Sequence, residues 1–123
     1  MARLLIADDD PDYLRAFRFG MEAMGHDVQT VDRGNKVEAE LKNAADPIDA
    51  VFLDVMMPEG GAVTVLHGLR KTWPDLPVFV ITGRTELFDS PLFKRGMREA
   101  NARVRKTASL EELDRLVRRQ VTA

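Results

Sequence analysis

Short apolar runs alternate along the chain with longer segments in which apolar residues recur every three or four positions. The runs predict five strands, at residues 4–7, 28–31, 50–53, 78–81 and 102–105. The first, third and fourth runs are apolar throughout, as in strands covered on both faces, whereas the second and fifth include polar side chains. We therefore expect the second and fifth strands at the edges of one sheet and the other three at its centre.

The segments between the runs have the spacing of amphipathic helices. Their apolar stripes are Leu14, Phe17, Met21 and Met24, then Val37, Leu41 and Ala44, then Leu66, Leu69 and Trp73, and at the end Leu113, Leu116 and Val117. Gly25 and Pro74 are typical of positions just after a helix, and Pro91 of a first helical position. Ser109 and Glu112 have the spacing of a capping box. We expect one helix after each strand.

Strands that alternate with helices predict an α/β fold, with a parallel sheet and helices on both of its faces. With the second and fifth strands at the edges, we expect the order 2-1-3-4-5 of a doubly wound (βα)5 sheet. The length of 123 residues indicates one domain, over residues 1–121, with no output domain after it. Sheets of this kind bind ligands at the carboxyl ends of their strands.

Polar side chains stand directly after four of the predicted strands. Asp8 and Asp9 follow the first strand, Asp54 the third, Thr82 the fourth and Lys106 the fifth. Because the carboxyl ends of parallel strands meet at one edge of a sheet, we expect these side chains to converge there.

The three adjacent aspartates after the first strand divide into two groups. Asp10 followed by Pro11 is typical of a helix start, with a side-chain acceptor at the cap and proline at the first position. Asp8 and Asp9 precede this cap, and the pattern assigns no donor to them. With Asp54 they place three carboxylates in one pocket, where their repulsion favours a bound cation. Oxygen ligands of this kind suit Mg²⁺, whereas a merely solvated acidic loop leaves the other polar strand ends unexplained.

These residues give the chain a resemblance to a known family. With the Asp8-Asp9 pair, the stretch FLDVMMP at residues 52–58, the Thr82-Gly83 pair and Lys106, it resembles the receiver domain of two-component response regulators. The resemblance covers nearly the whole chain and implies the flavodoxin-like receiver fold. It implies a phosphoacceptor that signals rather than a turnover enzyme, with a histidine kinase or histidine phosphotransfer protein as donor and a downstream protein partner.

The resemblance also implies a role for each site residue. Asp54 accepts a phosphoryl group from a phosphohistidine, and Mg²⁺ is the cofactor. Asp9 and Asp54 are the nearer metal ligands, Asp8 acts mainly through water, and Met56 supplies a backbone carbonyl. The two residues expected to contact the phosphoryl group are Thr82 and Lys106.

The chain departs from the family on the output side. The usual aromatic switch residue is replaced by Arg103, the proline after the lysine by Thr107, and Arg84 stands two residues beyond Thr82. A cis bond before a residue other than proline costs about 2.5–4 kcal/mol, so we expect a trans bond between Lys106 and Thr107. We also expect Arg103 to stay outward, either in a basic output face or on a solvated edge.

The composition narrows the class of protein. With 45% hydrophobic and 31% charged residues the chain is typical of a globular domain, and without cysteine it has no disulfide, thiol nucleophile or zinc–thiolate site. No apolar stretch is long enough to span a membrane, so we expect a cytoplasmic protein with no membrane partner. Residues 94–123 carry 9 basic and 4 acidic side chains, but aromatics are scarce there and direct nucleic-acid binding is not expected.

Two other functions stay open at this point. A phosphatase of the haloacid dehalogenase type also uses an aspartyl-phosphate and Mg²⁺, but needs a second aspartate at the position of Met56. A receiver-like module that binds its partner without phosphorylation is compatible with Arg103 and Thr107. Turnover of a generic phosphate ester distinguishes the phosphatase from a phosphorylation switch, and labelling of Asp54 by acetyl phosphate distinguishes the module that binds without phosphorylation.

Overall fold

The computed structural model describes residues 1–55, 61–84 and 90–121 of the chain. Within these ranges the strands are β1 (Arg3–Ala7), β2 (Asp27–Val31), β3 (Ala50–Asp54), β4 (Val78–Thr82) and β5 (Ala102–Arg105). The helices are α1 (Pro11–Ala23), α2 (Val37–Asn43), α3 (Ala62–Thr72), α4 (Pro91–Gly96) and α5 (Leu110–Val121), with a 3-10 turn, η1 (Gly34–Lys36), before α2. Among the described residues, none of the helices has the length and apolar character needed to cross a membrane.

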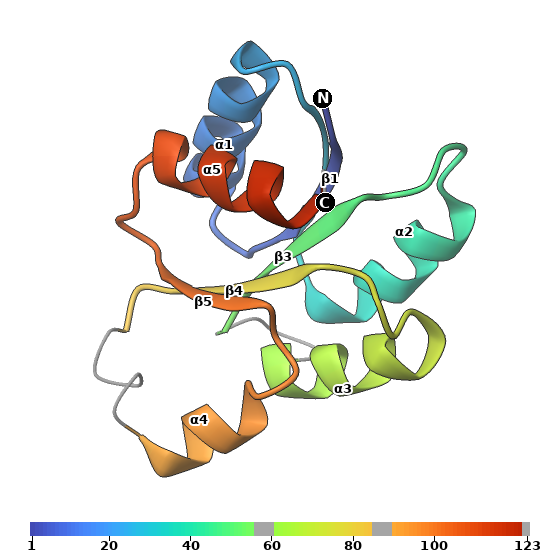
Figure 1. Ribbon diagram of the computed structural model, residues 1–123, viewed down its shortest axis with the longest axis vertical. Helices are drawn as coiled ribbons and strands as arrows, with labels where there is room; N and C mark the ends of the chain where they lie inside the picture. The colour runs from blue at the N-terminus through green and yellow to red at the C-terminus, as the bar shows by residue number, and fades with distance from the viewer. Residues whose placement is uncertain (56–60, 85–89, 122–123) are drawn as a thin grey trace.

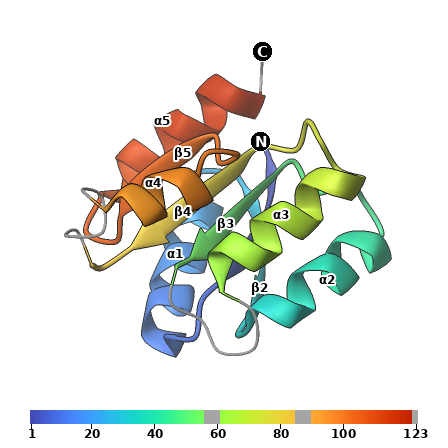
Figure 2. The ribbon, with the colours of Figure 1, turned by 90° about the horizontal axis from the view of Figure 1, so that it is seen from below.

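All neighbouring strands are parallel, and their order is β2-β1-β3-β4-β5, which confirms the predicted topology. Figures 1 and 2 show α1 and α5 on one face of the sheet and α2, α3 and α4 on the other. The predicted strand ranges are correct to within one residue at each end. Three residues of the predicted apolar stripes lie one position beyond their helices, as the C-caps of α1, α2 and α3: Met24, Ala44 and Trp73.

The core consists of two layers, because successive side chains of a strand point to opposite faces. On the α1 and α5 face, Phe17, Phe52 and Phe79 pack in a row, with ring centroids 4.9 and 5.0 Å apart. The residues of β3 and β4 are buried throughout, whereas β5 alternates between half-buried and exposed side chains. Strand β5 is therefore an edge that faces solvent, as its mixed sequence predicts.

Capping residues fix where the helices begin and end. The Asp10 side chain accepts hydrogen bonds from the backbone N–H groups of Asp12 and Tyr13, so its predicted role as the cap of α1 is confirmed. The Ser109 hydroxyl accepts one from the N–H of Glu112 at 3.2 Å. The reciprocal bond of a full capping box, from the Ser109 N–H to the Glu112 side chain, is absent from the described residues.

A buried histidine joins the start of β1 to α5. The Ala2 N–H donates to His26 Nδ1 at 3.0 Å, so the proton of the neutral ring lies on Nε2, which is 2.6 Å from Asp114 Oδ1. Burial alone would raise the pKa of Asp114, but hydrogen bonds from His26 and Arg118 outweigh it and lower that pKa. The arrangement is structural: it holds three segments of the chain together away from the acidic carboxyl ends of the strands.

Two glycine substitutions should change stability in opposite directions. Gly25 has φ of 95° and no atom within 4 Å of an added Cβ, so Gly25→Ala introduces only backbone strain. We expect it to lower the free energy of unfolding by about 1 kcal/mol. Gly68 also has free space but lies inside α3, so Gly68→Ala should raise this free energy by roughly 0.5–1 kcal/mol. Urea denaturation of both variants tests the pair, and a stabilised Gly25→Ala would contradict the backbone argument.

Candidate functional site

An acidic pocket lies where the carboxyl ends of β1 and β3 meet. Asp8 and Asp9 come directly after β1, and Asp54 is the last residue of β3. One carboxylate oxygen from each lies within 4.8 Å of the other two. Asp8 and Asp54 are buried, with 0% and 6% of their surface exposed, whereas Asp9 is exposed. The structure therefore brings together the three carboxylates that the sequence places at strand ends.

Asp8 has donors that the sequence pattern did not assign to it. Its Oδ1 accepts a hydrogen bond from the Asp10 N–H at 2.9 Å and another from Lys106 Nζ at 3.2 Å. The turn from β1 into α1 bends the Asp10 amide back toward Asp8, which explains the first bond. Oδ2 lies 3.0 Å from the same ammonium, but it is buried and has no hydrogen bond of good geometry in the described structure. The expectation of a carboxylate without donors was therefore wrong for one of its two oxygens.

Lys106 is the cation of the pocket. Its Nζ lies 3.0 Å from Asp8, 3.8 Å from Asp54 and 4.0 Å from Asp10. Burial alone would lower the pKa of Lys106, but the hydrogen bond to Asp8 and the charges of the three carboxylates raise it above its ordinary value. Lys106, which was expected to contact a phosphoryl group on Asp54, has its ammonium nearer to Asp8 than to Asp54 in this structure.

An aromatic residue that sequence analysis missed completes the pocket. The Lys106 ammonium lies 4.8 Å from the centre of the Tyr13 ring, in the first turn of α1. Burial, followed by the negative charges of Asp8 and Asp54, raises the pKa of Tyr13 to about 12. Its hydroxyl is therefore protonated at neutral pH. The signal was its position, since the first turn of a helix that starts directly after a central strand lies over the strand ends.

Thr82 ends β4 with its side chain 1% exposed. Its Oγ1 accepts the Arg84 N–H at 2.9 Å, and within the described residues its own hydrogen has no acceptor. An added Cβ at Gly83 would meet only Lys106 Cδ, at 3.9 Å, which is an ordinary contact. Packing in this conformation therefore does not require glycine at this position.

The bond between Lys106 and Thr107, just after β5, is trans, because the described residues include no cis peptide bond. The prediction of a trans bond is confirmed. The Lys106 N–H donates to Thr82 O at 2.8 Å, and the Ala108 N–H donates to Arg105 O at 3.0 Å. These bonds extend the ladder past β5 and close a turn that keeps Lys106 at the pocket. The predicted switch residues are all exposed, namely Arg84, Arg103 and Thr107. Met56 lies outside the described residues.

The acidic pocket has the ligands that a hard divalent cation needs. Three carboxylates converge, and Asp8 Oδ2 is a buried oxygen with no hydrogen-bond donor in good geometry among the described residues. Mg²⁺ is commonly held by one or two carboxylates together with waters and phosphate oxygens. The donor set therefore fits Mg²⁺, and residues Asp8, Asp9 and Asp54 are those that would hold it.

The sequence of the chain is similar to those of signalling proteins. A family model described as "Response regulator receiver domain" matches residues 4–118. The transcriptional regulatory protein KdpE of Mycobacterium tuberculosis is 38% identical over 90 residues, which cover 72% of this chain and 38% of that protein. The response regulator MprA of Mycobacterium avium is 39% identical over 82 residues, or 67% of this chain and 35% of that protein. The chain thus spans less than half the length of these relatives.

Solved structures agree in fold at lower identity. A receiver domain from Clostridium thermocellum has a TM-score of 0.87 and 23% identity, covering 99% of this chain and 95% of its own. A CheY-like receiver domain from Methanospirillum hungatei has a TM-score of 0.88 and 19% identity, covering 99% and 94%. The response regulator TrrA of Thermotoga maritima, in complex with Mg²⁺ and BeF, has a TM-score of 0.84 and 23% identity, covering 98% and 99%.

Proposed function

Because the chain belongs to the response regulator receiver domain family, we propose that it is a phosphorylation switch in which Asp54 accepts a phosphoryl group from a phosphohistidine. The observation that carries the proposal is the convergence of Asp8, Asp9 and Asp54 beside one lysine at the carboxyl ends of the strands. The donor is then a histidine kinase or histidine phosphotransfer protein, and the result is a changed interaction with a downstream protein, or transfer of the phosphoryl group to another carrier.

The chemistry follows from the placement of the pocket residues. An Asp54 oxygen forms a bond to phosphorus as the bond from phosphorus to the histidine nitrogen breaks, and the nitrogen keeps the electron pair. Bound Mg²⁺ supplies positive charge that offsets the carboxylates and the phosphoryl oxygens. Asp8, Asp9, Asp54 and the Met56 carbonyl would hold it. The TrrA complex with Mg²⁺ and BeF supports this assignment by likeness of fold.

Two side chains are available to bind the group once it is attached. The phosphoryl group adds about −1.5 to −2 charge at neutral pH. The Thr82 hydroxyl has a hydrogen to donate, and the Lys106 ammonium lies 3.8 Å from Asp54. We propose that both move toward the new charge, that the loop after β4 carries the signal, and that Arg103 remains exposed.

Intact mass spectrometry tests this function directly. Incubation with acetyl phosphate and Mg²⁺ should add the mass of one phosphoryl group, and a chelator should prevent the addition. Asp54→Ala should stay unmodified, whereas Asp12→Ala, an exposed carboxylate near the pocket, should be labelled like the parent. An unlabelled parent chain would favour a module that binds without phosphorylation. Continuous turnover of p-nitrophenyl phosphate would instead favour the phosphatase.

A further inference from the structure

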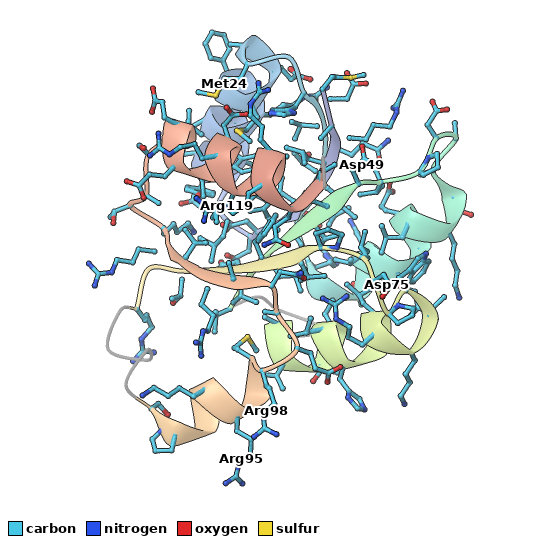
Figure 3. All side chains as sticks on the ribbon, viewed as in Figure 1. Met24, Asp49, Asp75, Arg95, Arg98 and Arg119 are labelled. Atoms are coloured by element: carbon cyan, nitrogen blue, oxygen red, sulfur yellow. The ribbon has the colours of Figure 1, made fainter. Side chains whose placement is uncertain are left out.

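A groove of about 510 Å³ runs along the outer edge of the sheet between β5 and α5. The residues of β5 and Leu116 of α5 form part of its lining. Four arginines surround it, Arg103 and Arg105 from β5 and Arg115 and Arg119 from α5. Figure 3 labels Arg119 on α5, and in Figures 1 and 2 this helix lies alongside β5.

The charge of this groove is not balanced within the part of the chain that the structure describes. None of the four guanidinium groups makes a hydrogen bond or ion pair within the described structure, while that of Arg118 on α5 is paired with Asp114. Glu112 is the one acidic side chain among the lining residues described. Guanidinium groups bind carboxylates through paired hydrogen bonds, so the groove is complementary to an acidic ligand.

The strand that forms one wall has an open edge. Strand β5 pairs with β4 on one side and is last in the sheet order, so no described strand covers its other side. In a parallel ladder, alternate residues direct their backbone N–H and C=O groups away from the neighbouring strand. Exposed edges of this kind can take up another strand, and charged side chains on them prevent self-pairing. Arg103 and Arg105 make β5 repel its own copy and attract an acidic strand.

We propose that this edge binds an extended acidic segment of a partner protein, which adds to the sheet as a strand next to β5. Its backbone pairs with β5, and its carboxylates bind Arg103, Arg105, Arg115 and Arg119. A nucleic acid suits the groove less well, because Glu112 lies among the arginines and a phosphate backbone has no N–H groups for an edge strand. This inference goes beyond the phosphorylation switch and requires no phosphoryl group on Asp54.

The test uses a fluorescein-labelled peptide of repeated Glu-Glu-Val-Val, which has glutamates on both faces of an extended strand, titrated with the unphosphorylated protein and followed by anisotropy. The peptide should bind, and a matched peptide of lysine and valine should not. Arg115→Gln/Arg119→Gln should weaken binding by about tenfold or more, since two charge pairs are lost. Lys71→Gln/Arg95→Gln removes the same charge from exposed positions on α3 and α4 and should leave binding unchanged. Asp54→Ala should bind like the parent, which separates this inference from the proposed phosphorylation.

Two N-methylated peptides test the strand geometry. Each keeps all glutamates but carries N-methyl groups on one alternate set of residues, so each loses the backbone donors of one edge. Only one of the two should lose binding, and the amide NMR signals of β5 should shift with the unmodified peptide. The proposal would be overturned if the unmodified peptide did not bind, or if both N-methylated peptides bound equally well. Tighter binding of a DNA duplex would also overturn it, as would equal weakening of binding by Lys71→Gln/Arg95→Gln.

Discussion

The Lys106→Ala variant is expected to lose about 2 kcal/mol of its free energy of unfolding at neutral pH without Mg²⁺, because a buried carboxylate loses its charged partner. Asp8 is fully buried, and the ammonium is the only cation that an ion pair places beside it in the described structure. The Asp10 N–H bond to Asp8 remains in the variant, which limits the loss. Urea denaturation in the presence of a chelator measures the difference.

The pH dependence of this difference has a defined sign. The pKa of Lys106 in the folded chain is raised above its ordinary value of 10.5. The contribution of its charge is therefore fully present below pH 10.5 and is lost as the pH rises through the higher folded value. We expect the gap between parent and Lys106→Ala to be constant from neutral pH to about 10 and to shrink above it.

A double-mutant cycle separates the ion pair from packing. Lys106→Met keeps most of the side-chain volume, and Asp8→Asn removes the charge of the partner. If the Asp8–Lys106 interaction carries the effect, Lys106→Met should cost much less in the Asp8→Asn background than in the parent. Lys71→Ala serves as the exposed control. If Lys106→Ala had the same free energy of unfolding as the parent, the Asp8–Lys106 pair would not contribute to the stability of the folded chain.

The arrangement of the sheet could be predicted because it depends on local patterns. The apolar runs of β3 and β4 are buried on both faces, and the mixed run of β5 lies at an edge, so burial follows directly from the run itself. The cap at Asp10 and the stop at Gly25 are likewise local, because each acts on backbone groups of its own turn. Local patterns of this kind are therefore sufficient to predict the fold and the approximate position of the site.

The contacts inside the pocket could not be predicted in the same way. Lys106 and Asp8 are 98 residues apart, and a flexible lysine can reach several carboxylates at the same strand ends. The Asp10 amide, which donates to Asp8, and the Tyr13 ring, which lies 4.8 Å from the Lys106 ammonium, also contact this pair, and the motif contains neither. The bond between His26 and Asp114 spans 88 residues and has no sequence signal at all. Side-chain pairings between distant elements therefore need the structure.

The second large effect is the stabilisation of the folded chain by Mg²⁺ and its dependence on Asp9, the exposed one of the three converging aspartates. The parent chain should gain about 2.7 kcal/mol in free energy of unfolding when Mg²⁺ is added to about 100 times its dissociation constant. Asp9→Asn should lose most of this gain at the same concentration, because it removes one of the three carboxylates that converge. Glu40→Gln, an exposed carboxylate on α2, should keep the gain and serves as the matched control.

Without Mg²⁺ the two neighbouring aspartates should behave oppositely. Asp9 makes no hydrogen bond or ion pair in the described structure and lies near two other carboxylates, so Asp9→Asn should relieve repulsion and slightly stabilise the chain. Asp8 is buried and bound by Lys106 and the Asp10 amide, so Asp8→Asn should destabilise it. Thermal unfolding with chelator measures both variants. A destabilised Asp9→Asn would mean that the carboxylates do not repel one another, and an undiminished response of that variant to Mg²⁺ would remove Asp9 from the metal site.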